Sequence, residues 1–562
     1  MKFLILSLLM LSMAYISDAQ FVSIPDTSFK SALLYLGVDT DEDGEISYVE
    51  AEAINSLDVS SKSISDMTGI EAFVNLDTLF CNWNSLSTLN VSGCTSLKYL
   101  SCWANQLTSL NIDGCNDLTK LECHSNLISS LDVSGLAALT YLDCGSNSLT
   151  SLTVSGCTAL TDILCVGNQL NELDLTGCVA LKKLDCPGNQ LYSLDVSDCI
   201  DLQELSCFAN LLSYLNVSGC TALKNMYCDF NMLTSLDVST CTALQELTCF
   251  ENRLISLNVS GCISLEILIC WGNQLSSLDV TGCLALRNLN CTKNQLISID
   301  ASGCTSLFEL YCQENQLTSL NVSGCSALTL LECGINQLTS LSVSGCSALA
   351  LLDCTANQLS SLDVTGCSAL STLTCPDNNL TSLNISDCSA LTWLSCDNNQ
   401  LTSLDVSNCS ELQYLSCNGN QLTSLNVSNN NGLFLISLTL MPELNEVCVW
   451  EVPFPPASTS IDTTGSSNIV FTTSCWTEIP GDNRELKIID VHPNPAREYI
   501  VFDLTNISSY ARVELYDLQG KKVLDQELAE DKRVTISNLP NGVYLFRLYD
   551  SGNFYSGKIT VE

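Results

Sequence analysis

Cysteine is the residue type with the most chemical potential in this sequence, because its 34 thiols could form disulfides, bind metals or act as nucleophiles. Seventeen cysteines follow one another at a constant spacing of 21 residues, from Cys81 to Cys417. A second column of 15 cysteines has the same period, from Cys94 to Cys409, and is interrupted only at Leu136. The thiols therefore follow a structural repeat.

The two columns are predicted to be buried thiols that pack as small hydrophobic side chains. Stacked parallel repeats would hold their Cβ atoms about 4.8 Å apart, wider than the about 3.8 Å of a disulfide. No C-x-x-C motif occurs, and the only histidine beside a column is His124, which argues against a metal site. Cys123 and His124 would face opposite sides of a strand, which argues against a catalytic pair. The predicted disulfide joins Cys448 to Cys475, which lie outside both columns.

Carboxylates are concentrated in residues 39–50, which read DTDEDGEISYVE. This segment is similar to the calcium loop of an EF-hand, and Gly44 occupies the position of its sharp turn. Apolar residues at helical spacing on both sides predict two short helices. Because calcium sensors usually pair two such loops and this chain shows one, we expect a structural Ca²⁺ site in an N-terminal cap. The predicted ligands are Asp39, Asp41, Asp43, Glu45 through its carbonyl, Ser47 through water, and Glu50.

Two pairs of carboxylates one repeat apart raise the possibility of a glycosidase-like enzyme. Glu122 with Asp143, and Glu332 with Asp353, would be separated much like the two carboxylates of a retaining glycosidase. Such pairs also arise wherever acidic residues occupy neighbouring repeats, and no insertion in the array could build a pocket around them. We therefore predict no catalytic residues and no enzyme.

The elements that must position these residues are short repeats of 21 residues. An asparagine stands three residues after every first-column cysteine, from Asn84 to Asn420, in the pattern L-x-x-L-x-C-x-x-N-x-L. This pattern resembles the leucine-rich repeat family over roughly residues 54 to 433, with cysteine in the third leucine position. The resemblance implies a solenoid of stacked short strands. The asparagine side chain should turn inward and bind backbone groups at the bend.

Aromatic residues gather on one face of the predicted solenoid. Thirteen of the 16 aromatic residues between positions 78 and 433 occupy the four variable strand positions that flank the first-column cysteine. These positions point away from the core and line the concave face. Grouped aromatic rings on a rigid scaffold are typical of protein or glycan binding. The predicted binding residues are Phe80, Trp83, Tyr99 and Trp103 in one group, and Phe208, Tyr227, Phe230, Phe250 and Trp271 in another.

A structural or lattice-binding role without a discrete ligand is the alternative. The column from Thr88 to Ser424 is Ser or Thr in 15 of 17 repeats, and the column from Asn90 to Asn426 is Asn or Asp in 15. Such regular rows could match a repeating ligand. They also suit the tight turns at the edge of a solvated solenoid.

Both ends of the chain predict export. Lys2 precedes the apolar stretch 3–16 and a small-residue cleavage pattern, which predicts a signal peptide removed near Gln20. Near the other end, the segments VHPNP at 491–495, LYDLQGK at 515–521 and LPNGVY at 539–544 look like the type A sorting domain of the type IX secretion system. That resemblance implies recognition by the outer-membrane translocon, cleavage by a sortase, and release or attachment at the cell surface.

We interpret the chain as a mainly β, secreted or cell-surface binding protein. The net charge of −40 argues against nucleic acid and anionic membranes as partners, and no membrane insertion is predicted. The expected partners are a protein or glycan ligand and the type IX secretion machinery. The predicted regions are a signal peptide (1–19), an EF-hand-like cap (20–56), a solenoid of about 17 repeats (57–433), a C-terminal cap with the disulfide (434–484) and an immunoglobulin-like sorting domain (485–562).

Overall fold

The computed structural model describes residues 21–473, 487–488, 491–502, 511–517, 521–528, 532–550 and 553–562. The predicted signal peptide lies outside the described residues. The chain divides into a repeat unit, Met1–Leu444 with Pro455–Asn468, and a C-terminal unit, Asn445–Phe454 with Ile469–Glu562. In the part of the chain that is described, no helix is both long and apolar enough to cross a membrane.

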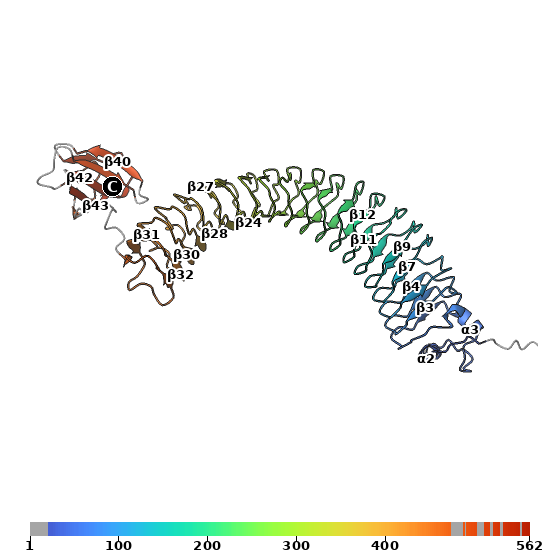
Figure 1. Cartoon of the computed structure of the whole chain (residues 1–562). Helices are drawn as coiled ribbons and strands as arrows, with labels where there is room; N and C mark the ends of the chain where they lie inside the picture. The colour runs from blue at the N-terminus through green and yellow to red at the C-terminus, as the bar shows by residue number, and fades with distance from the viewer. Residues whose placement is uncertain are drawn as a thin grey trace, which may run out of the picture. The chain divides into compact units, whose positions relative to one another are not determined.

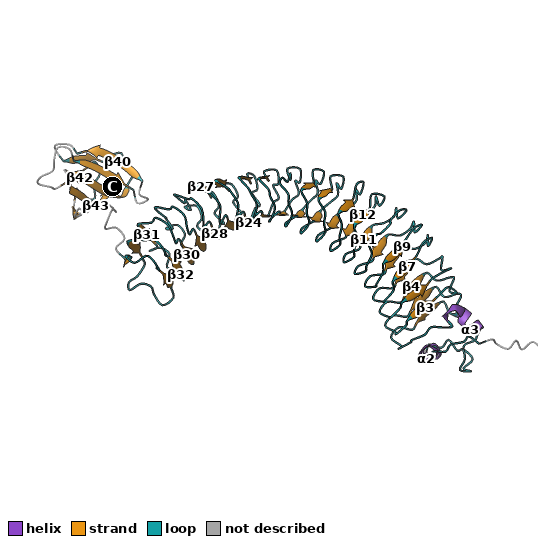
Figure 2. Ribbon diagram, in the orientation of Figure 1, coloured by secondary structure: helices purple, strands orange, loops and turns teal. Residues whose placement is uncertain are grey.

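The repeat unit begins with a small helical cap (Figure 2). Asp26 caps α2 (Thr27–Tyr35) by accepting a hydrogen bond from the N–H of Phe29 at 2.9 Å. Its second carboxylate oxygen accepts hydrogen bonds from the N–H and hydroxyl of Ser65, which ties the cap to the first repeat. Ser47 and Glu50 form a reciprocal capping box at the start of α3 (Tyr48–Ala53).

One parallel sheet of 20 strands runs along the repeat unit, one strand per repeat, and lines the inner side of its curve (Figure 1). Along the chain, a short 3₁₀ helix, Ile70–Ala72, stands between the first two strands of this sheet. The strands are β1 (Ser56–Asp58), β2 (Thr78–Phe80), β4 (Tyr99–Ser101), β6 (Lys120–Glu122), β8 (Tyr141–Asp143), β10 (Asp162–Leu164), β11 (Lys183–Asp185), β13 (Glu204–Ser206), β15 (Asn225–Tyr227), β17 (Glu246–Thr248), β19 (Ile267–Ile269), β20 (Asn288–Asn290), β22 (Glu309–Tyr311), β24 (Leu330–Glu332), β26 (Leu351–Asp353), β28 (Thr372–Thr374), β29 (Trp393–Ser395), β30 (Tyr414–Ser416), β32 (Leu435–Ser437) and β34 (Ser460–Asp462).

Parallel pairs of strands also form on the returning side of many repeats. There β3 pairs with β5, β7 with β9, β12 with β14, β16 with β18, β21 with β23 and β25 with β27. The strands of this side are β3 (Thr88–Asn90), β5 (Ser109–Asn111), β7 (Ser130–Asp132), β9 (Ser151–Thr153), β12 (Ser193–Asp195), β14 (Tyr214–Asn216), β16 (Ser235–Asp237), β18 (Ser256–Asn258), β21 (Ser298–Asp300), β23 (Ser319–Asn321), β25 (Ser340–Ser342), β27 (Ser361–Asp363) and β31 (Ser424–Asn426).

Both cysteine columns lie in the core between the two sides. All 32 of their thiols are buried and free, which confirms that they pack as small apolar side chains. Burial raises the pKa of thiols in both columns, for example that of Cys115 to about 11 and that of Cys165 to about 12, which favours their neutral form. Second-column thiols also lie against carbonyls of the preceding repeat, as Cys157 Sγ does at 3.1 Å from the oxygen of Val133.

The asparagine column joins each repeat to its neighbours from inside. The Asn105 side-chain amide donates to the carbonyl oxygens of Cys81 and Cys102, both at 3.0 Å, and its oxygen accepts from the N–H of Leu86 at 3.1 Å. The same three kinds of contact recur along the ladder, for example at Asn252. The predicted inward role of the asparagine is therefore confirmed.

The parallel sheet continues past residue 433, where the cysteine and asparagine pattern ends. Strand β32 pairs with β30, and β34 pairs with β32. Leu433, Ile436 and Leu438 are buried where earlier repeats have leucine, leucine and cysteine. The apolar pattern alone therefore suffices to extend the core after its sequence signature is lost.

The C-terminal unit holds a parallel strand pair and two further sheets. Cys448 is disulfide-bonded, and its predicted partner Cys475 lies outside the described residues. A five-stranded sheet, β36-β43-β42-β39-β40, and a three-stranded sheet, β37-β38-β41, share one apolar core. The strands are β33 (Glu446–Cys448), β35 (Val470–Thr472), β36 (Lys487–Ile488), β37 (Val491–His492), β38 (Tyr499–Phe502), β39 (Arg512–Tyr516), β40 (Lys522–Glu527), β41 (Arg533–Thr535), β42 (Gly542–Asp550) and β43 (Asn553–Val561).

Candidate functional site on the concave sheet

The strands of the concave sheet present two kinds of outward position. Within each strand the central leucine is buried, so its neighbours point outward, as Tyr99 does beside the buried Leu100. Two residues after the cysteine the backbone turns into the left-handed region, with φ of 55° at Trp83 and 51° at Phe230. These two side chains are 62% and 53% exposed. Repeats thus display rings both on the strand and at its end.

Rings of the first predicted group take part in one row over three repeats and in one separate pair. Trp83 and Trp103 meet edge to face with centroids 5.2 Å apart, and Trp103 stacks on His124 at 5.0 Å. Phe80 meets Tyr99 edge to face at 5.0 Å. We call Phe80, Trp83, Trp103 and His124 the N-terminal ring site. His124 is a member that the sequence analysis did not include.

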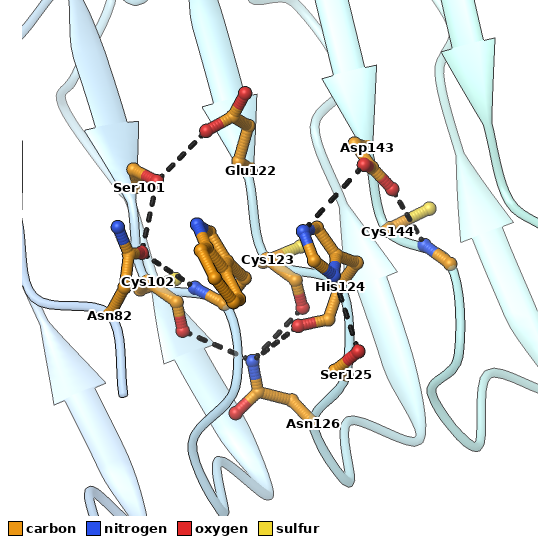
Figure 3. A network of polar contacts seen from close by, with 12 residues as sticks. Asn82, Ser101, Cys102, Glu122, Cys123, His124, Ser125, Asn126, Asp143 and Cys144 are labelled. Atoms are coloured by element: carbon orange, nitrogen blue, oxygen red, sulfur yellow. Dashed lines mark hydrogen bonds and ion pairs between the residues drawn. The ribbon is translucent and has the colours of Figure 1, made fainter. Parts of the chain in front are cut away.

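A polar network supports this site from beneath and beside it (Figure 3). Asn82 is buried, and its side-chain oxygen accepts hydrogen bonds from the Ser101 hydroxyl at 2.9 Å and from the N–H of Trp103 at 3.1 Å. On the next repeat, His124 Nε2 lies 3.9 Å from Asp143 Oδ2. Burial raises the pKa of Asp143. The network therefore holds the central ring in place and leaves an acidic group at one end of the row.

A lysine of the chain already lies on this face between aromatic rings. Lys120 Nζ is 4.6 Å from the ring centroid of Tyr99, 5.0 Å from that of Tyr141 and 2.7 Å from Glu122 Oε1. Burial acts to raise the pKa of Glu122, but hydrogen bonds from Lys120, Tyr99 and Ser101 outweigh it and lower that pKa. The concave face therefore binds a cation by ring faces and a carboxylate together.

The second predicted group contains a similar row. Phe230 and Phe250 meet edge to face at 5.1 Å, and Phe250 stacks on Trp271 at 4.8 Å. The Tyr227 hydroxyl donates to Glu246 Oε2 at 2.9 Å. We call Tyr227, Phe230, Phe250 and Trp271 the central ring site. Phe208, the remaining predicted residue, is 40% exposed and forms no ring pair among the described residues.

Beneath the central ring site lies a buried carboxylate. Asp229 accepts hydrogen bonds from the Thr248 hydroxyl at 2.6 Å and from the N–H of Phe250 at 3.1 Å. Burial raises the pKa of Asp229 to about 6, although these two hydrogen bonds act to lower it. The sequence predicted no buried acceptor role for Asp229 or Asn82, because nothing in a single repeat distinguishes a buried acceptor from a surface residue.

Two further aromatic residues on this face form a third cluster, which the sequence analysis did not group. Trp393 and Tyr414 stack with ring centroids 3.6 Å apart and planes 6° from parallel. They occupy the same position in successive repeats, 21 residues apart, so the spacing alone contained the signal.

Of the paired carboxylates, Glu122 already accepts hydrogen bonds and an ion pair from Tyr99 and Lys120. Glu332 accepts a hydrogen bond from Gln313, and Asp353 accepts one from the N–H of Thr355 at 2.9 Å. These contacts use both oxygens of Glu122 and one oxygen each of Glu332 and Asp353.

In the loop predicted to bind calcium, the structure brings together three of the six expected ligands. One carboxylate oxygen from each of Asp39, Asp41 and Asp43 lies within 4.8 Å of the others. Glu50 instead accepts hydrogen bonds from the N–H and hydroxyl groups of Thr40 and Ser47. Burial acts to raise the pKa of Glu50, but these four hydrogen bonds lower it to about 2.

The Asn/Asp column on the opposite side has a local structural role. Its side chains accept hydrogen bonds from the N–H two residues later, for example Asp132 from Ser134 at 2.8 Å and Asn426 from Ser428 at 3.0 Å. These contacts are Asx turns, which shape the exposed bend of each repeat. In many members of this column, one side-chain oxygen therefore already accepts a hydrogen bond within its own repeat.

Comparisons with known proteins find similar proteins for both units. The family described as secretion system C-terminal sorting domain matches residues 490–562. YopM from Yersinia enterocolitica WA-314 is 21% identical, with 79% of this chain and 94% of that chain covered and a TM-score of 0.51. The plant peptide hormone receptor RGFR1, solved in complex with RGF2, is 20% identical, with 75% and 79% covered and a TM-score of 0.50.

The functional domain of InlJ from Listeria monocytogenes, described as including a cysteine ladder, is 23% identical, with 97% and 98% covered and a TM-score of 0.42. No curated protein sequence matches the chain. The chain therefore has the leucine-rich repeat fold and ends, over residues 490–562, in a sorting domain of the type IX secretion system that directs it to the cell surface.

Proposed function

We propose that this chain is a cell-surface binding protein that holds a protein partner on the rings of its concave sheet. The observation that carries the proposal is the exposure of the two large rings Trp83 and Phe230. Both residues adopt positive φ, which costs a bulky side chain about 1 to 2 kcal/mol, and both remain more than half exposed. The same backbone recurs at this position in the other repeats, with glycine at Gly272 and with other side chains at Glu251 and Ile335. Two large rings placed there without burial in return point to contact with a partner.

Ring chemistry and scaffold both support this proposal. Tryptophan and tyrosine are enriched among the residues that dominate binding at protein interfaces. A repeat array without insertions presents them on a rigid surface, so little conformational entropy is lost on binding. RGFR1, which shares the fold, was solved with the partner RGF2. The rows of rings therefore suit a protein better than the glycan that the sequence also allowed.

The test replaces the exposed rings with the residue that their backbone favours. In Trp83→Gly and Phe230→Gly, binding of peptides selected from a displayed random library on the full chain should weaken at least tenfold. Unfolding free energy should change by no more than about 1 kcal/mol, because glycine relieves the strained backbone. Ala356→Gly is the matched control, since Ala356 has φ of 52° in a repeat without rings.

Two results would contradict this function. Selected peptides that bind the double variant as tightly as the wild type would place binding elsewhere. If the library yields no peptides that bind the wild type better than the double variant, the aromatic rows are not a binding surface.

We also propose that Asp39, Asp41, Asp43, Glu45, Ser47 and Glu50 hold a structural Ca²⁺ ion that stabilises the cap. The three clustered aspartates supply hard oxygen ligands, and Gly44, with φ of 84°, makes the turn between them. Full coordination would require Glu50 to exchange its hydrogen bonds from Thr40 for the ion. The contact of Asp26 with Ser65 would then transmit the gain to the first repeat.

Calcium should raise the stability of the cap by about 1.4 to 2.7 kcal/mol at 10 mM, for dissociation constants of about 10⁻³ to 10⁻⁴ M. Hydrogen exchange of α2 and α3 amides, with Ca²⁺ and with EDTA, measures the effect. Asp41→Asn should reduce it, and equal Mg²⁺ serves as the control ion. Identical exchange with Ca²⁺ and with EDTA would exclude the site.

The secretion machinery that recognises the sorting domain is a further partner. We propose that a sortase removes this domain at the surface, as the family resemblance implies. Export of a chain truncated before residue 485 should fail, and the mature protein should lack residues 490–562 by mass spectrometry.

A further inference from the structure

The two ring sites contain corresponding residues at a constant distance in the sequence. Each ring of the N-terminal site has a partner 147 residues later, which is seven repeats of 21. Phe80 corresponds to Tyr227, Trp83 to Phe230, Trp103 to Phe250 and His124 to Trp271. The buried acceptor Asn82 corresponds to Asp229, and the hydroxyl donor Ser101 to Thr248.

The geometry of the two sites agrees as closely as their residues. The edge-to-face pair has centroids 5.2 Å apart at 74° in one site and 5.1 Å apart at 80° in the other. The stacked pair measures 5.0 Å at 13° and 4.8 Å at 11°. In both sites the buried acceptor receives one hydroxyl and the N–H of the central ring residue, the latter at 3.1 Å. The three rings of each row are therefore arranged alike in the two sites.

The correspondence is strongest in these repeats. Six of the 12 face positions in the three repeats of each site keep their chemical type, counting the positions three and one before the cysteine and one and two after it, and taking Asn and Asp as one type. In the four repeats that follow each site, four of 16 such positions match by the same rule, namely Asp143 with Asn290, Asp162 with Glu309, Asp185 with Glu332 and Ala209 with Ala356. The likeness is therefore twice as frequent at the sites as in the repeats that follow them.

The chemistry around the rings favours a cation. A carboxylate lies beside each row, at positions that do not correspond to each other. Asp143 lies beside His124 on the next repeat. Glu251 follows Phe250, and its Oε1 would lie 3.0 Å from a Cβ placed on Gly272. Lys120, held between Tyr99, Tyr141 and Glu122, shows how this face takes a positive side chain. The net charge of −40 would draw a basic partner to the solenoid.

We propose that one partner binds both ring sites at once, and that this partner is a polypeptide presenting the same cationic segment twice, about 34 Å apart. The distance follows from seven strand steps of about 4.8 Å. The inference rests on the proposed function, because it assigns the partner of those same rings. Binding at two sites makes the second contact intramolecular, so avidity exceeds the affinity of either site.

The experiment uses the full chain and two synthetic probes in 150 mM salt. The single probe is the heptapeptide Gly-Arg-Gly-Arg-Gly-Arg-Gly. The tandem probe joins two copies through about 40 Gly/Ser residues, whose root-mean-square span is roughly 35 Å. Two copies joined without a linker, with centres at most about 25 Å apart, are the control that cannot place a whole copy at each site. Trp103→Ala and Phe250→Ala each remove one central ring without changing the charge.

Calorimetry should find two single probes per wild-type chain, one per chain in either variant and none in the double variant. The tandem probe should bind the wild type 1:1 and at least 100-fold tighter than the single probe, and either variant should abolish that gain. The unlinked control should show no such gain. If an alanine variant loses its circular dichroism signal, Trp83→Gly and Phe230→Gly replace it with the same expectations.

The outcomes separate this inference from the proposed function. Loss of binding in one variant only would overturn the two-site inference and leave ring binding intact. Probe binding unaffected by any variant would overturn the cationic partner, whatever the peptide library selects on the same rings. Saturation of both sites by cellohexaose instead of the peptides would assign them to a glycan and overturn the polypeptide.

Discussion

Replacing Asn252 with alanine should lower the free energy of unfolding by about 3 kcal/mol or more. The Asn252 amide donates to the carbonyl oxygens of Cys228 at 3.0 Å and Cys249 at 3.1 Å, and its oxygen accepts from the N–H of Leu233 at 3.0 Å. The substitution leaves the buried N–H of Leu233 unpaired, at a cost of about 1 to 3 kcal/mol. It also removes one of the two hydrogen bonds that each carbonyl accepts, at about 0.5 to 1.5 kcal/mol each, while those from Asn231 and Asn273 remain. The loss exceeds that of an ordinary surface change, which stays within about 0.5 kcal/mol.

Guanidinium unfolding followed by circular dichroism measures this effect. Gln274→Ala, one position beyond the next ladder asparagine and exposed, is the matched control and should leave the midpoint unchanged. Because repeats are stabilised by their immediate neighbours, hydrogen exchange should rise most in the repeats around residues 228 to 273. A loss below about 1 kcal/mol would show that the ladder amides contribute little to the stacking.

The second large effect concerns the buried carboxylate under the central ring site. Asp229→Asn should raise the free energy of unfolding at pH 7.5 by up to about 3 kcal/mol. The pKa of Asp229 is about 6 in the folded chain, against an ordinary value of 3.8. Between these values the folded chain binds more protons than the unfolded chain, so stability falls as pH rises from about 4 to 6 and stays low above.

Asparagine should remove this loss because it keeps the acceptor and carries no charge. Asn82 already makes the equivalent contacts with Ser101 and Trp103 in the N-terminal ring site. Denaturant unfolding of the wild type and of Asp229→Asn at pH 4, 5, 6 and 7.5 should show that the difference in their free energies of unfolding grows with pH. Asn82→Asp should give the mirror result, losing stability as pH rises. Parallel pH profiles for wild type and Asp229→Asn would refute the prediction.

Much of the fold could be predicted from the sequence because the same 21-residue pattern recurs many times. The burial of Cys102 and the inward turn of Asn105 follow from their place in a 21-residue unit, which stacking reproduces along the array. The two groups of exposed rings could also be predicted, since outward strand positions alternate with buried ones. Features that depend on contacts between repeats could not be predicted in this way.

Several site features illustrate that limit. Asn82 and Asp229 look like surface residues in sequence, and only the neighbouring repeat reveals that their acceptors are buried and receive hydrogen bonds. Glu50 occupies a calcium-ligand position, yet its carboxylate binds Thr40 and Ser47 in this conformation. The Asn/Asp column looked like a possible ligand surface, whereas its oxygens accept from N–H groups two residues later.

The sequence by itself determined the repeat, the buried columns, the exposed rings and the sorting domain, because each is a property of residues close together in the chain. Only the tertiary structure decided which rings touch, that Trp83 and Phe230 project from left-handed backbone, and that the two ring sites share one geometry. These depend on the register between repeats and on hydrogen bonds 19 to 24 residues apart, which no single repeat contains.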